Sequence, residues 1–192
     1  MMIHKFDQKN KQKLDNEWRR ENLPPVETLK NLGLKETDSF ADIGCGIGYF
    51  TIPAAKMIGN NNAYALDTSP EMLEELELRS KAAGIKNIEI VKTQDLDLMI
   101  PDASVSFGLM VNVIHEIVDK NQFLEESSRI LRPGGKLAIV DWEKAETKTG
   151  PPIDHRIGSD EVKTMLAEIG FECQEMINIA ETFYGLVFVK NN

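Results

Sequence analysis

The sequence predicts an α/β fold with a doubly wound, mostly parallel sheet of seven strands that ends in an antiparallel C-terminal hairpin strand. Strand and helix signals alternate from about residue 38 onward, as expected when helices connect parallel strands. A glycine-rich turn follows the first strand signal, and the last two strand signals have no helix between them. Because only antiparallel neighbours can be joined by a short turn, the chain must reverse direction once at its end.

The first half of the predicted core contains three strands and two helices. Before it, Pro24 and Pro25 separate two N-terminal helices, the second of which runs to Gly33. Ser69 is a helix N-cap with Pro70 as first helical residue, and Gly84 ends that helix. The expected strands are 39–43, 63–67 and 88–92, and the expected helices are 50–58 and 70–83.

The second half contains the remaining four strands and a long loop. A helix over 120–131 ends at Pro133, and Ser159 caps a last helix that stops at Gly170. The expected strands are 105–111, 136–141, 171–177 and 184–189. Residues 143–156 form a loop with two prolines, and loops of this length in compact domains are often functional. The hairpin connection is expected around 178–183.

Length and composition favour one domain over 1–192, with a helical cap over 1–37 and an α/β core over 38–192. No apolar run approaches the roughly 20 residues that cross a bilayer, so no membrane partner is expected. Residues 1–13 are polar and Lys-rich, without the apolar stretch of a signal peptide. These features predict a cytoplasmic protein, and both a monomer and a homodimer are compatible with them.

Charge and cysteine content exclude further classes. The net charge of −9 makes nucleic acid an unfavourable partner, since an acidic domain repels phosphate backbones. Residues 1–35 are the exception, with 8 basic and 5 acidic side chains, and we interpret them as a solvated amphipathic segment. Cys45 and Cys173 fit neither a disulfide framework nor a zinc pattern, so both are expected to be free thiols.

The strongest motif is the glycine turn at 41–50, which reads Ala-Asp-Ile-Gly-Cys-Gly-Ile-Gly-Tyr-Phe. Its glycines allow a sharp turn and close approach of a ligand, and the following helix offers unpaired N–H groups. Gly44 and Gly46 fit a dinucleotide fingerprint, but Tyr49 stands where that fingerprint has glycine or alanine. Asp42 would repel a pyrophosphate and suits a cationic group, such as the ammonium of an amino acid.

Two more acids follow the next strands of the predicted sheet. Asp67 ends the second strand, where a carboxylate can accept hydrogen bonds from ribose hydroxyls, although a helix-entry turn also explains it. Asp95 follows the third strand and is suited to accept from an adenine amino group, with Leu96 lining the ring pocket. Met72 could cover an adenine face or simply belong to the core. Ligands bind at this carboxyl edge in open α/β sheets.

With these residues the sequence resembles the class I S-adenosylmethionine-dependent methyltransferases, over nearly all of residues 38–190. Residues 105–115 look like the fourth strand of that Rossmann-like fold and its exit, and the Arg-Pro-Gly-Gly step at 132–135 looks like the segment before its fifth strand. More narrowly, the chain is similar to enzymes of the ubiquinone and menaquinone biosynthesis type, which often act on small molecules. The resemblance implies S-adenosylmethionine as cofactor and S-adenosylhomocysteine as product. The expected cofactor-binding residues are Asp42, Gly44, Cys45, Gly46, Asp67, Thr68, Met72, Asp95, Leu96 and Asn112.

Two histidines are candidates for the catalytic base of methyl transfer. His115 follows the fourth strand and has an unperturbed pKa of about 6.5, suitable near neutrality, but the alternative is that it packs under the cofactor or caps the next turn. His155 lies in the 143–156 loop, where it and Arg156 could bind an acidic acceptor or assist deprotonation, or belong to a solvated linker. Tyr184 is a weaker acceptor-side candidate. No ligand spacing supports a metal site, even from Asp141 with the loop residues.

The predicted function is therefore transfer of a methyl group from S-adenosylmethionine to a small-molecule acceptor by in-line displacement. Alternatives remain open: a non-catalytic S-adenosylmethionine-binding or regulatory protein, since fold does not prove chemistry, and a protein or RNA methyltransferase. A nicotinamide-dependent oxidoreductase is disfavoured by Asp42, Tyr49 and the terminal hairpin. The acceptor, the methylated atom and the oligomeric state are not encoded in any pattern that we detect.

Overall fold

The computed structural model describes residues 14–147 and 149–191, and they form a seven-stranded sheet with the order β3-β2-β1-β4-β5-β7-β6. The five strands β1 to β5 pair in parallel, and β7 is antiparallel to both of its neighbours. The predicted fold class is therefore confirmed. The strands are β1 (Phe40–Ile43), β2 (Ala63–Asp67), β3 (Ile88–Lys92), β4 (Val105–Val111), β5 (Leu131–Trp142), β6 (Phe171–Ala180) and β7 (Phe183–Lys190).

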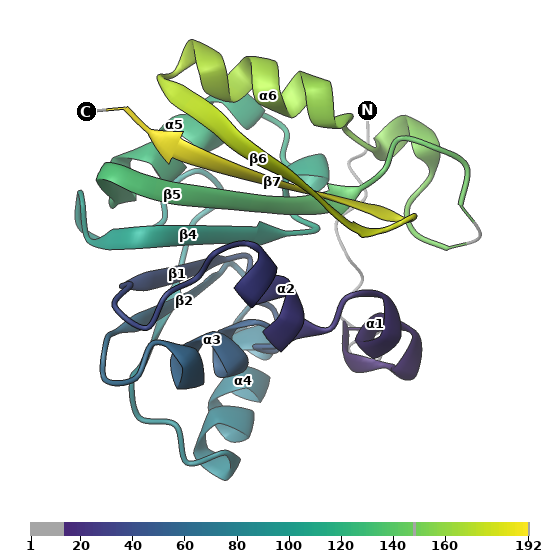
Figure 1. The fold of residues 1–192 in the computed structure, drawn as a ribbon. Helices are drawn as coiled ribbons and strands as arrows, with labels where there is room; N and C mark the ends of the chain where they lie inside the picture. The colour runs from purple at the N-terminus through teal and green to yellow at the C-terminus, as the bar shows by residue number, and fades with distance from the viewer. Residues whose placement is uncertain (1–13, 148, 192) are drawn as a thin grey trace.

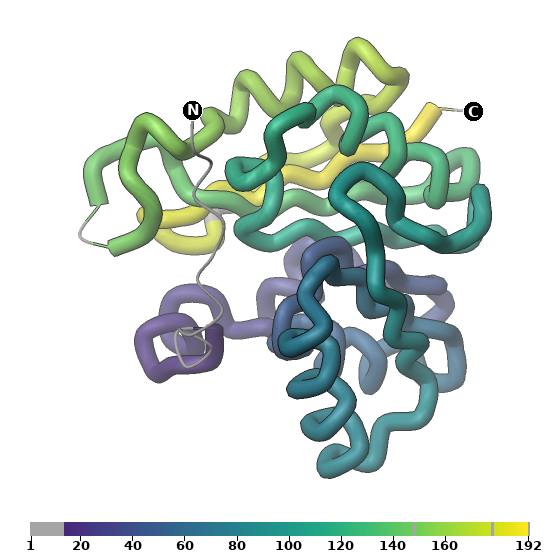
Figure 2. Tube along the Cα trace, turned by 180° about the vertical axis from the view of Figure 1, so that it is seen from behind, coloured from purple at the N-terminus to yellow at the C-terminus, as the bar shows by residue number. Residues whose placement is uncertain are grey.

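Helices cover both faces of this sheet. One face is covered by α2 (Pro25–Asn31), α3 (Thr51–Met57) and α4 (Pro70–Ala82), which contribute Leu29, Ala54 and Leu76 to the core. The other face is covered by α5 (Lys120–Ile130) and α6 (Ser159–Glu168), which contribute Leu124 and Leu166 to the core. In Figure 1, α2 and α3 lie in front of the strands, and in Figure 2, seen from behind, α5 lies in front. Burial of apolar surface on both faces stabilises the sheet.

The helix boundaries of α4 follow the predicted local chemistry. The Ser69 hydroxyl accepts a hydrogen bond from the Met72 N–H at 3.3 Å, and Pro70 begins the helix. Gly84 has a φ of 69°, as expected for the glycine that terminates a helix. The sequence prediction is therefore confirmed at both ends of this helix. The predicted N-terminal helix corresponds to α1 (Glu17–Asn22), and its part over residues 1–13 lies outside the described residues.

Three predicted boundaries were wrong. β5 begins at Leu131 rather than 136, because Leu131 already pairs with Val105 and a bulge absorbs the following residues before Lys136 pairs with Phe107. β6 extends to Ala180, so that only two residues connect it to β7. The N-cap of α6 is Gly158 rather than Ser159, since the carbonyl of Gly158 accepts the first helical hydrogen bond.

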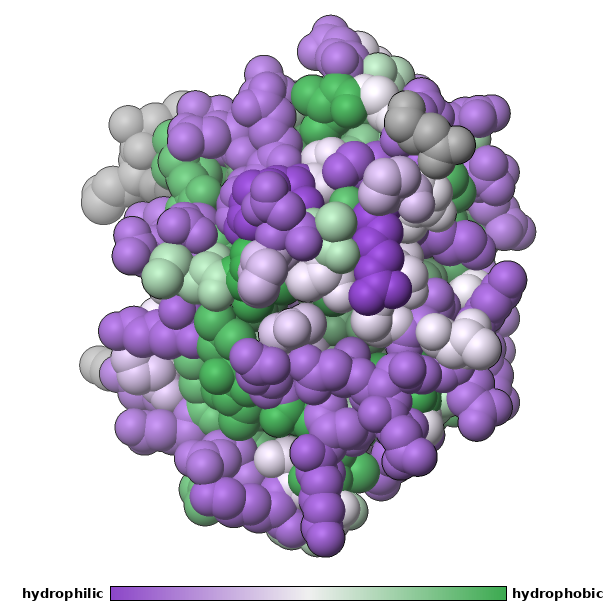
Figure 3. Space-filling view, turned by 90° about the vertical axis from the view of Figure 1, so that its left-hand side faces the viewer, coloured by the Kyte–Doolittle hydropathy of each residue, from purple (hydrophilic) through white to green (hydrophobic). Residues whose placement is uncertain are grey.

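The two sides of the molecule at which the strands end carry different segments. Figure 1 shows α1 and the 143–156 loop on the same side of the molecule, where β4 and β5 end. The loop contains one short helix, η3 (Ile153–His155), and another, η2 (Ile114–Glu116), follows β4. The opposite side, shown in Figure 3, is covered mostly by hydrophilic side chains with apolar patches between them. The carboxyl edge, with its covering segments, is therefore the place to look for a ligand site.

Candidate functional site

The glycine turn between β1 and α3 lies at the carboxyl end of a central strand. Gly44, Gly46 and Gly48 have φ angles of 76°, 52° and 81°, a region that side chains with a Cβ rarely adopt. A Cβ at Gly48 would lie 2.8 Å from Cδ1 of Leu76, and a Cβ at Gly44 would collide with Val113. These two glycines are therefore required by close packing of α4 and of the β4 exit against the turn.

Gly46 has a less crowded environment, because its nearest neighbour is the flexible side chain of Leu14. A Cβ there would meet Leu14 Cδ1 at 3.5 Å, an ordinary contact with a flexible side chain from outside the sheet. Leu14 belongs to the segment that leads into α1. The backbone of Gly46 is therefore uncrowded and partly exposed, so a ligand can approach it.

Asp67 joins the glycine turn to the end of β2. Its Oδ2 accepts a hydrogen bond from the Gly46 N–H at 2.8 Å, and its Oδ1 accepts one from the Ser69 N–H at 2.9 Å. Burial raises the pKa of Asp67, while backbone N–H groups, that of Ser69 foremost, act in the opposite direction. Each carboxylate oxygen can accept a further hydrogen bond, so Asp67 can still bind ligand hydroxyls. Thr68 beside it is exposed.

Asp42 is a buried carboxylate on β1, with 3% of its surface exposed. Thr51 Oγ1 donates a hydrogen bond to Asp42 Oδ2 at 2.6 Å. Burial raises the pKa of Asp42 to about 7, and the charge of Asp67 contributes to the rise, while the Thr51 hydrogen bond opposes it. A cationic ligand group would stabilise the ionised form of such a carboxylate. The sequence analysis did not identify Thr51 as a partner of Asp42. Its position in the first turn of the helix that follows the glycine turn would have suggested this role.

The other predicted cofactor residues divide between buried and exposed positions. Cys45 and Met72 are buried, with 6% and 4% of their surfaces exposed, and they form part of the packed wall around the turn. Leu96 is half-buried against the core, whereas Asp95 is exposed in the segment that follows β3. Asp67 and Asp42 meet at the turn, since Asp67 accepts a hydrogen bond from Gly46 and Asp42 lies two residues before Gly44.

Asn112 lies at the exit of β4, next to the residue that packs against Gly44. Its φ is 59°, and its backbone N–H donates to the Val140 carbonyl at 2.8 Å. Its side-chain Oδ1 is buried without a hydrogen-bond partner among the described residues. A buried acceptor without a partner is costly and points to a donor supplied by something else.

His115 and Asp141 form a buried pair on the α5 and α6 side of the sheet. His115 Nδ1 lies 2.7 Å from Asp141 Oδ1, and their side chains are 7% and 1% exposed. Burial lowers the pKa of His115, but the hydrogen bond and charge of Asp141, together with Glu116, outweigh it, so that the pKa is raised. Glu116 Oε1 lies 3.8 Å from Nε2 of the same ring. Nδ1 is thus held by a hydrogen bond, whereas Nε2 makes no hydrogen bond among the described residues and has only the more distant Glu116 beside it, so this second nitrogen is available for proton transfer.

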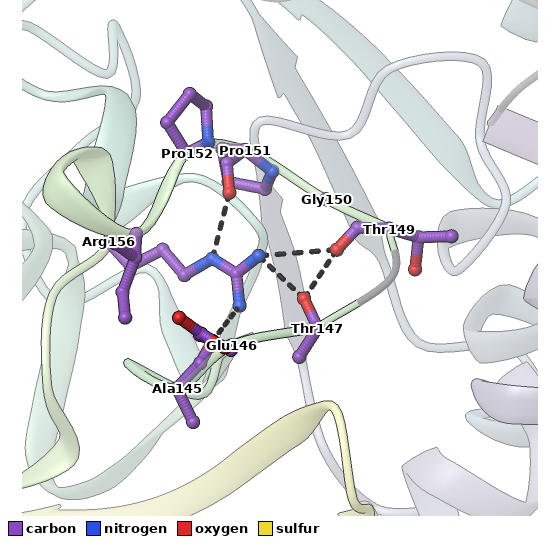
Figure 4. Close-up of a pocket in the computed structure, with 9 residues that line it drawn as sticks. Ala145, Glu146, Thr147, Thr149, Gly150, Pro151, Pro152 and Arg156 are labelled. Atoms are coloured by element: carbon purple, nitrogen blue, oxygen red, sulfur yellow. Dashed lines mark hydrogen bonds between the residues drawn. The ribbon is translucent and has the colours of Figure 1, made fainter.

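The 143–156 loop is organised by Arg156, which is 6% exposed. All five N–H groups of its guanidinium are used, as Figure 4 shows in part. The acceptors are the carbonyls of Glu143, Ala145, Thr149 and Pro151 and the Thr147 hydroxyl, at 2.6–3.2 Å. Contrary to expectation, Arg156 therefore has no donor left for an acceptor substrate. The loop encloses a hollow of about 430 Å³.

The second predicted loop residue, His155, and the acceptor-side candidate Tyr184 are both set back from the surface. His155 is half-buried in η3. Tyr184 is 1% exposed on β7, and its hydroxyl is buried without a hydrogen-bond partner among the described residues. Burial strongly raises the pKa of Tyr184, and the nearby charge of Asp141 adds to this. The hydroxyl therefore remains protonated at ordinary pH.

Aromatic side chains connect α1 to the end of β5. The rings of Trp18 and Trp142 stack with centroids 6.0 Å apart and an 8° interplanar angle. Phe183 lies against both, with centroids 4.5 Å from Trp142 and 6.0 Å from Trp18. The Arg156 guanidinium lies 5.4 Å from the Trp142 ring. This aromatic cluster of Trp18, Trp142 and Phe183 escaped sequence analysis, since the three residues are far apart in the chain.

The part of the chain that the structure describes contains neither a metal-ligand cluster nor a membrane-spanning helix. There, no three His, Cys, Asp or Glu side chains gather as ligands for a metal ion. Within the same residues, no helix is both long and apolar enough to span a membrane.

Comparisons with known proteins agree with this geometry. A family model described as "Methyltransferase domain" matches residues 41–139, about half of the chain. The crystal structure of a SAM-dependent methyltransferase from Aquifex aeolicus is 32% identical, with a TM-score of 0.91, and the match covers 96% of this chain and 99% of that one. The similarity therefore extends from the glycine turn to the N-terminal and C-terminal elements.

Two further similarities, one to a curated methyltransferase and one to a cyclase of the same fold, concern the activity and the fold respectively. A demethylmenaquinone methyltransferase of Listeria welshimeri is 30% identical over 130 residues, which are 67% of this chain and 52% of that protein. The chain thus spans about half the length of such curated relatives. The [4+2]-cyclase SpnF has the same fold at 15% identity, with a TM-score of 0.76 over 92% of this chain and 83% of its own. A shared fold therefore does not by itself establish methyl transfer.

Proposed function

Since the chain belongs to the family of S-adenosylmethionine-dependent methyltransferases, we propose that it transfers a methyl group from S-adenosylmethionine to a small-molecule acceptor. The observation that carries the proposal is the arrangement of Asp42 and Asp67 around the approachable backbone of Gly46. Two carboxylates at this position suit a cationic nucleoside and disfavour a pyrophosphate.

The residues around the turn fit the parts of this cofactor. Asp42 would hold the ammonium of its amino-acid tail, because a cation relieves the cost of ionising a buried carboxylate. Asp67 would accept hydrogen bonds from the ribose hydroxyls with the lone pairs that Gly46 and Ser69 leave free. The unpartnered Oδ1 of Asn112 would accept a hydrogen bond from a donor of the cofactor. The remaining contacts are assigned to Gly44, Cys45, Thr68, Met72, Asp95 and Leu96.

The protein supplies orientation, exclusion of water and a base. When bound, S-adenosylmethionine provides a methyl group activated by its sulfonium. An in-line displacement then needs an aligned acceptor atom from which a proton can be removed. We assign that proton to Nε2 of His115, because Asp141 holds Nδ1 and fixes the ring. His155 is the second candidate, from the covering loop.

The acceptor is proposed to be a small molecule. Relatives named demethylmenaquinone methyltransferases support this class, and so does the net charge of −9, which disfavours RNA. The aromatic cluster Trp18, Trp142 and Phe183 lies at the end of β5, and we assign its two half-buried tryptophans to an apolar wall of the acceptor site. Apolar walls with few polar groups are typical of sites for small molecules.

The proposal is tested first by ligand-induced stabilisation. We expect S-adenosylmethionine and S-adenosylhomocysteine, but not NAD, to raise the melting temperature by roughly 5–10 °C at about 100 times their dissociation constants. The rise should be lost in Asp67→Asn and kept in Asp160→Asn, a matched change at a 94% exposed side chain. Stabilisation by NAD alone would overturn the proposal.

A second experiment identifies the class of acceptor. Cofactor labelled in its methyl group is incubated with the protein and with separate small-molecule, RNA and protein fractions of a cell extract. We expect label in the small-molecule fraction, and much less with His115→Ala. Label in RNA or protein would overturn the small-molecule assignment. Cofactor binding without transfer to any fraction would favour a non-catalytic binding protein.

A further inference from the structure

Helix α1 is attached to the carboxyl edge from several directions. Asp15, just before it, forms an ion pair with Arg79 of α4 at 2.8 Å. Tyr49 of the glycine turn donates a hydrogen bond from its hydroxyl to the Leu23 carbonyl at 3.1 Å. Trp18 stacks on Trp142 at the far side of the site. The helix therefore has a defined position over the glycine turn, although it contributes no strand or core helix.

Arg19 is the residue of α1 that faces the glycine turn. Its guanidinium lies 4.9 Å from the centre of the Tyr49 ring. Among the described residues, the buried Nε of Arg19 has no hydrogen-bond partner, and Arg19 forms no ion pair. The neighbouring Arg20, by contrast, is 65% exposed and paired with Asp15 at 2.8 Å. A buried guanidinium with a free donor is costly unless an anion or acceptor completes it.

The sign and position of this charge complement those of Asp42. Arg19 and Asp42 influence each other electrostatically, yet they form no ion pair, so they are close without being in contact. Both flank the turn, one from the helix above and one from β1. A ligand group that carries an ammonium and a carboxylate on one carbon would satisfy both charges together.

We propose that Arg19 binds the carboxylate of the amino-acid tail of the cofactor, while Asp42 binds its ammonium. The inference rests on the proposed function, since it assumes S-adenosylmethionine as the ligand. It extends that function by assigning α1 to the cofactor site and by giving Arg19 a specific partner atom group. A planar guanidinium can bind a carboxylate through two parallel hydrogen bonds, and the buried Nε of Arg19 is one suitable donor.

The test compares two ligands that differ only in this carboxylate. S-adenosylmethionine and its decarboxylated form are titrated by calorimetry into the wild-type protein, Arg19→Met and Arg20→Met. We expect Arg19→Met to weaken S-adenosylmethionine binding by about 10- to 100-fold and to leave the affinity for the decarboxylated form within about twofold. Arg20→Met should leave both affinities unchanged. Arg19→Lys should restore part of the lost affinity, since it keeps the charge but not the planar fork.

The outcomes separate this inference from the proposed function. Retained binding of the decarboxylated cofactor shows that the Arg19→Met protein is folded. Equal losses for both ligands would mean that Arg19 only supports the fold, and no loss for either would mean that it does not contact the tail. Both results would overturn the assignment while leaving the methyltransferase proposal intact. Failure of the wild-type protein to bind either ligand would instead overturn the proposed function itself.

Discussion

Nδ1 of His115 lies 2.7 Å from Oδ1 of Asp141, and this contact joins the exit of β4 to the end of β5 within a nearly closed environment. Asp141 is itself fixed, since the Trp142 N–H donates to the same carboxylate oxygen at 2.7 Å. The pair resembles other arrangements in which a carboxylate orients an imidazole that exchanges protons through its second nitrogen. Its consequences for activity are open to direct measurement.

Replacing Asp141 with Asn should lower the pKa of His115, because it removes the negative charge that raises it and leaves at most a neutral hydrogen bond to the ring. A base acts when neutral, so the wild-type activity should rise with pH through a value above 6.5, the ordinary pKa of histidine. In the variant this rise should move to lower pH, and kcat should fall by roughly 10²- to 10⁴-fold. The pH profile of kcat/KM checks this. An unshifted profile would exclude His115 as the base.

Asp42 should make the stability of the ligand-free protein depend on pH. Its pKa is 3.8 in the reference state and about 7 in the fold. The folded form therefore holds the proton more tightly, so the contribution of Asp42 to stability is complete below pH 4 and lost as the pH rises to 7. Asp42→Asn should gain stability relative to wild type over this range, by up to about 4 kcal/mol. Urea unfolding at several pH values measures the difference, which should be absent for Asp160→Asn.

The same carboxylate should link cofactor affinity to pH. If Asp42 binds an ammonium, only its ionised form is productive. The affinity for S-adenosylmethionine should then rise as the pH increases toward about 7 and level off above it, and Asp42→Asn should bind weakly without this dependence. Calorimetry across this range provides the measurement. A pH-independent affinity in the wild-type protein would contradict the assignment of Asp42 to the tail.

Arg156→Lys should loosen the 143–156 loop without disturbing the glycine turn. Lysine keeps the charge but cannot reach five acceptors at once, so the loop loses most of its cross-links. We expect faster amide exchange at Ala145, Thr147, Thr149 and Gly150, a loss of about 2–3 kcal/mol in stability, and a higher KM for the acceptor with unchanged cofactor affinity. Arg132→Lys, at an exposed site with two carbonyl acceptors, is the control. Equal effects of the two changes would argue against a special role of Arg156.

Gly44→Ala and Gly84→Ala form a matched pair for the glycine turn. Both positions have positive φ, 76° and 69°, but only Gly44 is crowded, by Val113. Gly84→Ala should cost about 1 kcal/mol from backbone strain alone. Gly44→Ala should cost about 2–3 kcal/mol more, because the β4 exit must move away, and should abolish cofactor binding. Chemical unfolding measures the two stability losses, and calorimetry measures cofactor binding. Equal stability losses for the two variants, with cofactor binding retained in Gly44→Ala, would contradict this prediction.

The sequence by itself determined the fold class, the parallel strands with their terminal antiparallel hairpin, and the glycine turn at the carboxyl edge of the sheet. Local chemistry was sufficient there. Alternating apolar segments define strands and helices, Ser69, Pro70 and Gly84 set the ends of α4, and the glycine turn with Asp42 and Asp67 marks the carboxyl edge. These features depend on neighbours within a few residues, or on the general rule that parallel strands end at one edge.

Only the tertiary structure decided which distant side chains meet. His115 finds Asp141 26 residues later, and α1 brings Arg19 over Tyr49 while Trp18 meets Trp142. The use of Arg156 by its own loop was likewise invisible, because its acceptors are mostly backbone carbonyls that every residue carries. Such contacts depend on how the helices and loops pack on the sheet. Local residue patterns do not predict which distant segments this packing brings together.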